Sequence, residues 1–332
     1  MHDAMEKHGR SYMHALAKIG LAVAGLALPA AAAADIDVDI DVYGRLNLTL
    51  QNSDEALGEK VELQNNASRV GVKGELELQE GLKVIYQLEW GVDLDDQEDE
   101  AFTDRNQFVG LEGSFGTVMV GRHDTALKQS QGDFDLFDDL EGDIDGVFNG
   151  EVRLNDYIGY VTPTFAGALS GTLNFFPGED PDTGNDGAVD AVSMSLKYEK
   201  DAVYAAFAHD RDVDGENFET TRLVGGYTVG PARVMLLYQL ADAGGVNEDG
   251  FGASVAWTFA NAVAKLQYLT ADSWRVDPQP DPLANRLEDL LSVGLDHKLG
   301  ESTRLFGFYT TGDIGGTSER NDYVAVGIEH NF

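Results

Sequence analysis

The sequence contains no cysteine, only 8 prolines and, after Leu28, no apolar run long enough to form a transmembrane helix. The absence of cysteine excludes disulfides, thiolate metal sites and thiol catalysis. Scarce proline together with 38 glycines is typical of many strands joined by tight turns. Because no later segment could cross a bilayer as a helix, any membrane role of the mature chain must come from strands.

Basic residues are also scarce. The sequence contains 23 Lys and Arg and 58 Asp and Glu, which gives a net charge of −35. Such a surface repels nucleic acid, which we exclude as a partner, and attracts cations. Solubility or a saline habitat is an equally good account of the excess acid, since solvated loops carry most of it. The mean hydropathy of −0.24 is compatible with membrane insertion of a barrel, in which only alternate residues meet lipid.

The N-terminal segment has the pattern of an export signal. Basic residues precede an apolar run at 19–28, and the small residues that end at Ala34 provide a cleavage site. The run is too short to cross a bilayer core of about 30 Å as a helix. We therefore predict a cleaved signal peptide over residues 1–34, with Met13 as an alternative start. Residues 35–332 contain no linker and are expected to form one domain.

The last ten residues alternate between apolar and polar side chains and end on an aromatic residue. Val324, Val326, Ile328 and Phe332 share one face of an extended strand, opposite Ala325, Gly327, Glu329 and Asn331. The same period of two recurs at 45–50 and 82–90. A soluble sandwich would also alternate, but with more Val, Ile and Leu in each strand. An exported chain with this ending favours an outer-membrane β-barrel, whose inward side chains meet water and whose outward side chains meet lipid.

Connections of two lengths alternate along the chain. Short turns are expected near 79–81, 113–116, 163–167, 199–201, 229–232, 260–262 and 299–302, and long polar loops over 51–64, 93–104, 123–152, 177–188, 210–219, 241–249, 271–285 and 311–321. Seven turns and eight loops join sixteen strands. Short periplasmic turns and long external loops are characteristic of transmembrane barrels. Aromatic residues near strand ends are candidates for interfacial girdles or for ordinary packing: Tyr43, Trp90, Tyr160, Tyr198, Tyr238, Trp257, Tyr268 and Tyr309.

Three stretches together resemble the general diffusion porins of Gram-negative bacteria. They are VYGRL at 42–46, SRVGVKG at 68–74 followed by GLK at 81–83, and FVGL at 108–111 leading to FGTVMVGR at 115–122. The resemblance covers the first strand through the third loop and returns at Phe332, whereas the strands between match only in pattern. It implies an all-β, transmembrane, antiparallel barrel of 16 strands in the cell outer membrane, usually as a homotrimer surrounded by lipid and lipopolysaccharide.

The resemblance also implies that the third long loop folds into the lumen and narrows it. Residues 123–152 match that constriction loop in position and length. A loop of about thirty residues without regular structure is commonly functional. Its acidic residues are the candidate negative side of the constriction: Asp133, Asp135, Asp138, Asp139, Glu141, Asp143 and Asp145.

Arginines on the barrel wall are the candidate positive side. The positions that match the family's basic ladder are Arg45, Arg69, Arg105 and Arg153, with Arg122 at the start of the loop. Parity independently places Arg45 and Arg69 opposite the apolar faces of their strands. A lipid-facing arginine would cost about 2–4 kcal/mol at the bilayer midplane, although each arginine could instead extend along the wall to the rim. The chain departs from many relatives at Gly159, where they carry a further arginine.

An acidic loop that faces fixed guanidinium groups creates a transverse field across a narrow aqueous opening. Such a field admits small polar solutes and ions and disfavours apolar ones. With the surplus acids, the missing arginine favours a passive diffusion channel with mild cation preference. The alternatives are a substrate-selective porin and, from a different class, a barrel-anchored adhesin or receptor. We expect neither cofactor nor enzymatic activity, because the sequence contains no G-x-S-x-G, HExxH or P-loop motif.

One acidic segment copies the first half of a calcium loop, and a second segment approximates it. Asp210, Asp212 and Asp214 precede Gly215, and Glu141, Asp143 and Asp145 precede Gly146. Both lack the bidentate glutamate at the twelfth position, which is Thr221 in one segment and Val152 in the other. Neither is flanked by helices. The first segment is therefore a weak calcium candidate, with a solvated acidic loop as the alternative.

Overall fold

The computed structural model describes residues 38–55, 58–95, 101–178, 187, 189–245, 247–271, 287–314 and 319–332. The predicted signal peptide lies outside the described residues. The elements are β1 (Val38–Glu55), β2 (Gly58–Asn65), β3 (Arg69–Gln79), β4 (Leu82–Val92), β5 (Phe102–Gly113), β6 (Gly116–Asp124), α2 (Ala126–Gln129), η1 (Ile144–Gly146), β7 (Arg153–Val161), β8 (Leu169–Phe176), β9 (Ala191–Lys200), β10 (Val203–Arg211), β11 (Phe218–Val229), β12 (Ala232–Ala243), β13 (Asn247–Phe259), β14 (Ala262–Ala271), β15 (Leu287–Lys298), β16 (Thr303–Ile314) and β17 (Arg320–Asn331). Among the described residues no helix is long and apolar enough to cross a membrane.

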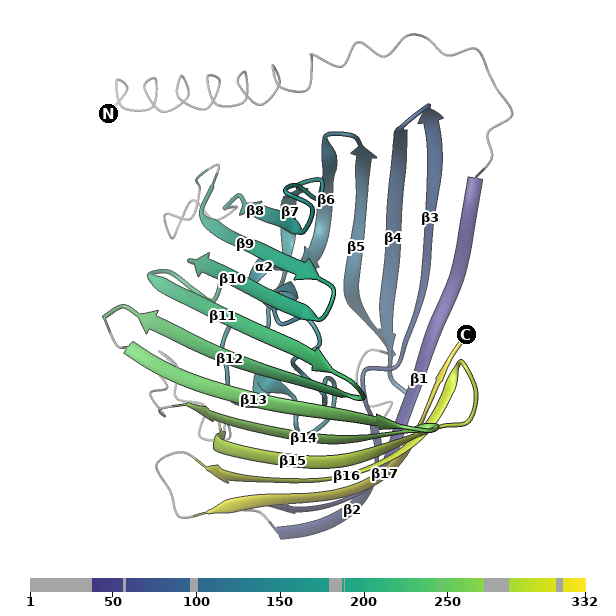
Figure 1. Ribbon diagram of the computed structural model, residues 1–332, viewed down its shortest axis with the longest axis vertical. Coiled ribbons are helices and arrows are strands. Elements are labelled where there is room, and N and C mark those ends of the chain that lie inside the picture. The colour runs from purple at the N-terminus through teal and green to yellow at the C-terminus, as the bar shows by residue number, and fades with distance from the viewer. Residues whose placement is uncertain are drawn as a thin grey trace.

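Antiparallel pairing of neighbouring strands closes the sheet into a barrel (Figure 1). Strand β17 closes the ring by pairing with β1, and the two amide–carbonyl bonds between Gly44 and Phe332 continue this ladder. On its other side, β1 pairs with β3 over its first half and with β2 over its second half. Strands β2 and β3 are thus one spanning strand, kinked at Ala67, where φ is +49°. The 17 labelled strands therefore make the predicted antiparallel barrel of 16 strands.

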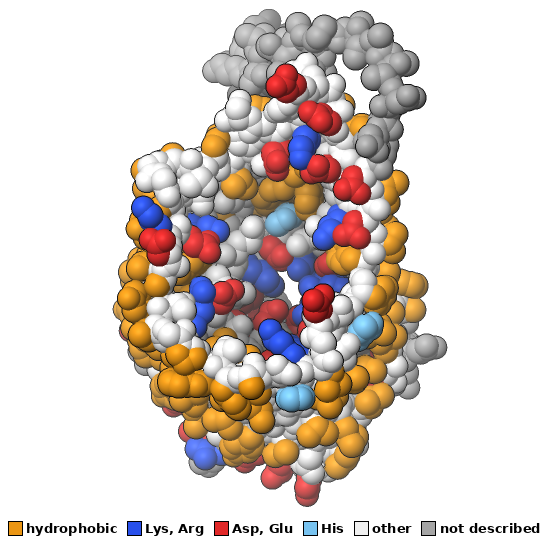
Figure 2. Space-filling model, turned by 45° about the vertical axis from the view of Figure 1, so that its right-hand side comes forward, with side chains coloured by type: hydrophobic (Ala, Val, Ile, Leu, Met, Phe, Trp, Pro, Cys, Tyr) orange, Lys and Arg blue, Asp and Glu red, His pale blue; other side chains and the backbone are white. Residues whose placement is uncertain are grey.

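The two faces of the barrel differ as the alternation predicts. Along β17, Val324, Val326 and Ile328 are 46–61% exposed on the outer face, whereas Ala325 and Glu329 are buried on the inner face. Figure 2 shows apolar side chains around the outside and charged side chains around the hollow centre. A continuous exposed apolar belt is too large for a free surface in water and fits contact with lipid.

Connection lengths agree with the prediction at one end of the barrel and partly at the other. All seven short turns lie where they were expected, between strands β3 and β16. The expected loop over 51–64 is wrong, because β1 continues to Glu55 and β2 begins at Gly58, so the two strands form a long hairpin. Polar residues in this segment suggested a loop, but a paired strand whose inner face is polar carries the same composition.

Tyr43 is an exception among the aromatic girdle candidates. Its hydroxyl donates a hydrogen bond of 2.9 Å to Glu89 on the inner face of the barrel. The position of Tyr43 near a strand end suggested the girdle. Because Tyr43 and Arg45 are two residues apart on β1, however, both side chains point to the inside of the barrel. Tyr198, Tyr238, Trp257, Tyr268 and Tyr309 lie exposed on the outer face.

Candidate functional site

A backbone bulge near the end of β6 precedes the long segment between β6 and β7. Gly121 has φ of +140°, and a Cβ there would collide with the Gln107 carbonyl on β5. The register of β6 against β7 shifts at this point, and pairing then continues through Asp124, after which the chain leaves the wall. Thr125 then caps α2 by accepting the Lys128 N–H at 3.1 Å. The bulge that precedes the segment therefore requires glycine.

Apolar residues of this segment pack against the inner face of the barrel. Phe134 and Phe148 are completely or almost completely buried, in one cluster with Leu237 of β12 and Leu269 of β14. Wall glycines make room for these rings, since a Cβ at Gly252 would overlap Phe134 and one at Gly250 would overlap Phe148. Together with Phe137 and Leu140, which pack on β16 and β17, these contacts form what we call the loop seat.

Polar side chains of the wall fasten the backbone of the segment. The Gln267 amide accepts the Leu136 N–H at 2.8 Å and donates to the Gly142 carbonyl at 2.8 Å. Lys265 donates to the Leu136 carbonyl at 2.8 Å. Buried loop backbone would otherwise leave these groups unsatisfied.

Asp139 connects the tip of the segment to the opposite strands. Its carboxylate forms ion pairs with Arg45 of β1 and with Arg69 of β3, the latter at 2.6 Å. The residue has φ of +63°, a conformation that aspartate tolerates better than most residues. The structure thus brings together two of the predicted arginines and one predicted acid.

The other predicted arginines have carboxylate or amide partners on the wall. Arg105 donates to Glu89 at 2.7 Å, and Arg153 pairs with Asp124 at 2.9 Å. Arg122 has an amide partner instead, since it donates to Asn155 of β7 at 2.9 Å. The predicted basic ladder is therefore a set of wall ion pairs, with Arg122 outside it.

Besides Asp139, four of the predicted acids lie in a compact turn: Asp135, Asp138, Asp143 and Asp145. Asp135 accepts the N–H groups of Phe137 and Ile144, and Asp143 accepts those of Asp139 and Asp145, all at 2.8–3.0 Å. Carboxylate oxygens of Asp135, Asp138 and Asp143 lie within 4.8 Å of one another, a spacing that a cation could bridge. Burial raises the pKa of Asp143 to about 6, because removal from water disfavours its charge. The same cause raises the pKa of Asp135 well above its usual range.

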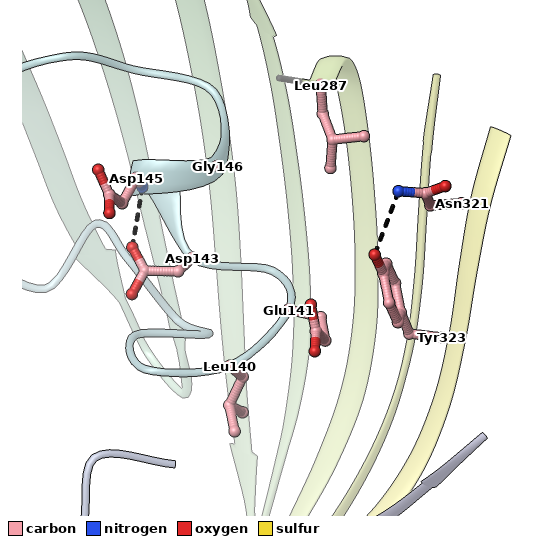
Figure 3. A pocket seen from close by; sticks show the side chains of 8 residues that line it. All are labelled: Leu140, Glu141, Asp143, Asp145, Gly146, Leu287, Asn321 and Tyr323. Carbon is pink, nitrogen blue, oxygen red and sulfur yellow. Dashed lines mark hydrogen bonds between the residues drawn. The ribbon is translucent and has the colours of Figure 1, made fainter. Parts of the chain in front are cut away.

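The remaining acids lie at the edges of the segment. Glu141 accepts from Gln51 at 2.8 Å, and burial raises its pKa. Asp133 is largely exposed and pairs with Arg233 at 3.1 Å. A cavity of about 280 Å³ opens beside Glu141 and Asp143 (Figure 3), and its lining residues are Leu140, Glu141, Asp143, Asp145, Gly146, Leu287, Asn321 and Tyr323. This acidic alcove contains three carboxylates and no basic side chain in its lining.

Sequence reasoning missed the ion pairs behind the segment. Arg222 of β11 is fully buried and donates to Glu151 at 2.6 Å, to Gln239 at 2.8 Å and to the Asn149 carbonyl at 3.1 Å. Lys265 and Arg304 also form ion pairs on the wall, both with the carboxylate of Asp296. Parity could have found Arg222 and Lys265, since outward Leu223 and Leu266 follow them. The apolar residues among the loop acids were the missed signal for the loop seat.

Comparisons with known proteins agree with this architecture. A family described as Gram-negative porin matches residues 20–317. The chain is 27% identical over 285 residues to the major outer membrane protein P.IB of Neisseria meningitidis, covering 80% of this chain and 83% of that protein.

Solved structures show the same fold. An anion-selective porin from Comamonas acidovorans has a TM-score of 0.76 at 23% identity, covering 89% of this chain and all of that one. The trimer form of OmpT from Vibrio cholerae has a TM-score of 0.63 at 16% identity, covering 89% and 99% of the two chains. With a family match over most of its length and a closed barrel with an apolar outer belt, this chain belongs to the Gram-negative porins of the outer membrane.

Proposed function

We propose that the protein is a passive diffusion channel for small hydrophilic solutes and ions, with mild preference for cations. Residues 123–152 form its constriction, between the acids of the loop and the arginines of β1 and β3. Binding and release need no chemistry in such a pore, so no enzymatic activity is expected. The family match and the hollow, charged centre support the channel.

The observation that carries the cation preference is the distribution of ion pairs. Arg45 and Arg69 share Asp139, and Arg105 and Arg153 each have a carboxylate partner. Asp138, Glu141 and Asp143 form no salt bridge among the described residues. The charge of the wall arginines is thus partly offset locally, whereas the loop acids add negative potential to the opening.

The sign of the preference is a property of the side chains and not of the fold. The structural neighbour from Comamonas acidovorans is an anion-selective porin, and at 23% identity it shares only the architecture. A homotrimer is likewise proposed here, by analogy with the trimer form of OmpT from Vibrio cholerae. Outer-membrane lipid and lipopolysaccharide are its expected surroundings.

Reversal potentials across planar bilayers in a KCl gradient test the preference. We expect a wild-type channel that favours K⁺, and a preference reduced in Asp138→Asn, whose carboxylate is exposed beside the arginines. Glu199→Gln, near the end of β9, is the matched control and should leave the reversal potential unchanged. An anion-preferring wild type, or equal effects of both substitutions, would refute the charge argument.

Liposome swelling tests the diffusion mode itself. Uptake that falls smoothly with solute size supports diffusion, and saturable uptake of one solute supports the substrate-selective alternative. No uptake at all would favour the adhesin or receptor.

A further inference from the structure

Asp210 occupies an unusual position on the inner wall. It lies opposite Ser193 of β9 and Thr220 of β11 in the strand register, and only 1% of its surface is exposed. Neither carboxylate oxygen makes a hydrogen bond of normal geometry, although Ser193 is close enough to stabilise the charge. The Thr220 hydroxyl, which is also fully buried, has no hydrogen-bond partner either. Three buried oxygen atoms on adjacent strands therefore lack adequate partners.

The surrounding charge is negative. Asp214 and Glu151 act on Asp210 with like charge, and Arg222 is the cation that acts on it. Arg222 already donates to Glu151, Gln239 and Asn149. A buried carboxylate without a dedicated cation is costly, and such a group is normally neutralised by a proton or by a bound metal ion.

The loop after β10 folds over this position. Val213 is buried in the cluster that contains Tyr157 and Phe176, so the loop turns into the barrel. Asp212 accepts the Asn217 N–H at 2.8 Å and pairs with Arg211. Its carboxylate therefore shapes the turn, whereas Asp214 remains within electrostatic range of Asp210.

Both ends of the constriction segment also meet here. The Ser193 hydroxyl accepts the Leu127 N–H at 3.1 Å, and a Cβ at Gly150 would lie 3.7 Å from Thr220. The position is therefore enclosed by the wall, by the loop after β10 and by both roots of the segment.

We propose that Asp210, Thr220 and Asp214 bind a divalent cation, with calcium as the best fit. The ligand atoms would be the Asp210 carboxylate, the Thr220 hydroxyl and the Asp214 carboxylate, completed by water. All are hard oxygen donors, and calcium accepts six to eight of them in irregular geometry. The set contains no nitrogen or sulfur ligand of the kind that zinc prefers.

This arrangement differs from a helix–loop–helix calcium site. Thr221, the twelfth residue of the sequence motif, lies on the outward parity and contacts His209 at 2.9 Å. Thr220, one residue earlier, faces Asp210. The ligands are therefore defined by strand register, and the incomplete motif does not exclude binding.

Isothermal titration of calcium into the refolded, lipopolysaccharide-free protein in neutral detergent tests the proposal. Prior treatment with a chelator removes bound metal, and about 0.15 M KCl screens the acidic surface. We expect one saturable site with a dissociation constant on the order of 10⁻⁴–10⁻³ M. Calcium should also slow hydrogen exchange of the amides at 211–218.

Variants distinguish specific binding at this site from nonspecific attraction of calcium to the acidic surface. Asp210→Asn should weaken calcium binding at least about tenfold, as expected for loss of a charged ligand of a calcium site. Asp212→Asn keeps the acceptor of the turn and should bind calcium like the wild type. If Asp210→Asn fails to fold, Thr220→Val provides the test and should weaken binding. No saturable binding by the wild type, or equal losses in Asp210→Asn and Asp212→Asn, would overturn the proposal.

Discussion

The inner wall of the barrel has two regions of opposite character. From β10 to β17 it is largely dry, because the loop seat covers it with phenylalanine rings. Across β1, β3 and β5 it carries Arg45, Arg69 and Arg105 in partly exposed ion pairs. Strand alternation is the same in both regions, so parity decides which side chains face inward but not whether they meet water. The expectation that every inward side chain is wetted is therefore wrong for the loop seat.

The comparison also indicates how the opening is shaped. One wall holds the loop, and the other wall supplies the charges that the loop faces. Asp139 is the residue that joins them, since it belongs to the loop and pairs with arginines of the opposite strands. Changes on the dry side should therefore alter stability and pore size, whereas changes on the charged side should alter selectivity.

The largest expected effect comes from breaking the buried pair on the dry side. Arg222→Met leaves Glu151 buried without its cation, and we expect the free energy of unfolding to fall by about 3–5 kcal/mol. The reason is the fully buried position of Arg222. Denaturant titration of the refolded protein, followed by tryptophan fluorescence, measures the change.

The double variant Glu151→Leu with Arg222→Met is the control for this prediction. Removing both charges eliminates the unpaired carboxylate, so much of the lost stability should return. A double variant as unstable as Arg222→Met alone would mean that packing of the arginine stem, and not its charge, stabilises the seat.

Particular residues show how far the sequence could predict the molecule. Val324 and Val326 indicate the outer face directly, because a period of two is a local property of strands. The arginines of β1 and β3 follow from parity together with family resemblance. Arg222 and Phe134 were not predicted as contacts, since their partners lie 71 residues away at Glu151 and far along the chain at β12 and β14. Pairings between a loop and a distant wall depend on closure of the barrel, which no local pattern encodes.

A second effect should follow from filling the space that a wall glycine leaves. Gly252→Ala would place a methyl group against Phe134, and overpacking of this kind costs about 1–3 kcal/mol. Because the ring must shift, we also expect the single-channel conductance to change. Gly225→Ala is the matched control, since a Cβ there meets nothing within 4 Å. If the two variants had the same stability and conductance, the packing of the loop seat would not be what holds the loop in place.

On the charged side, Asp139→Asn should change selectivity more than stability. The substitution removes the shared partner of Arg45 and Arg69, so two guanidinium charges become available to solutes. We expect the K⁺ to Cl⁻ permeability ratio to fall by at least about twofold, because charge acts strongly in a narrow pore. Asp133→Asn, which alters a largely exposed pair, should have little effect. If Asp139→Asn left the reversal potential unchanged, ions would not pass close to these arginines.

The smallest expected effect is the dependence of selectivity on pH. Burial raises the pKa of Asp143 from 3.8 to about 6 and that of Glu151 from 4.5 to about 7. Because both pKa values are raised by folding, the folded state holds these protons more tightly than the unfolded chain does. The resulting stabilisation is complete below the ordinary pKa of each group. It is lost as the pH rises through about 6 for Asp143 and about 7 for Glu151. Their negative charge develops over the same window, and Asp143 borders the acidic alcove.

We therefore expect cation preference to grow as the pH rises from about 5 to about 8. Bilayer reversal potentials across this range measure it, and Asp143→Asn should flatten the lower part of the curve near pH 6. Asp139→Asn should shift the whole curve toward anions without flattening it, because it removes a charge that stands against two arginines and leaves Asp143 in place. A wild-type cation preference that did not change with pH would mean that the alcove does not face the path of the ions, and the charged region would then be confined to the arginine side.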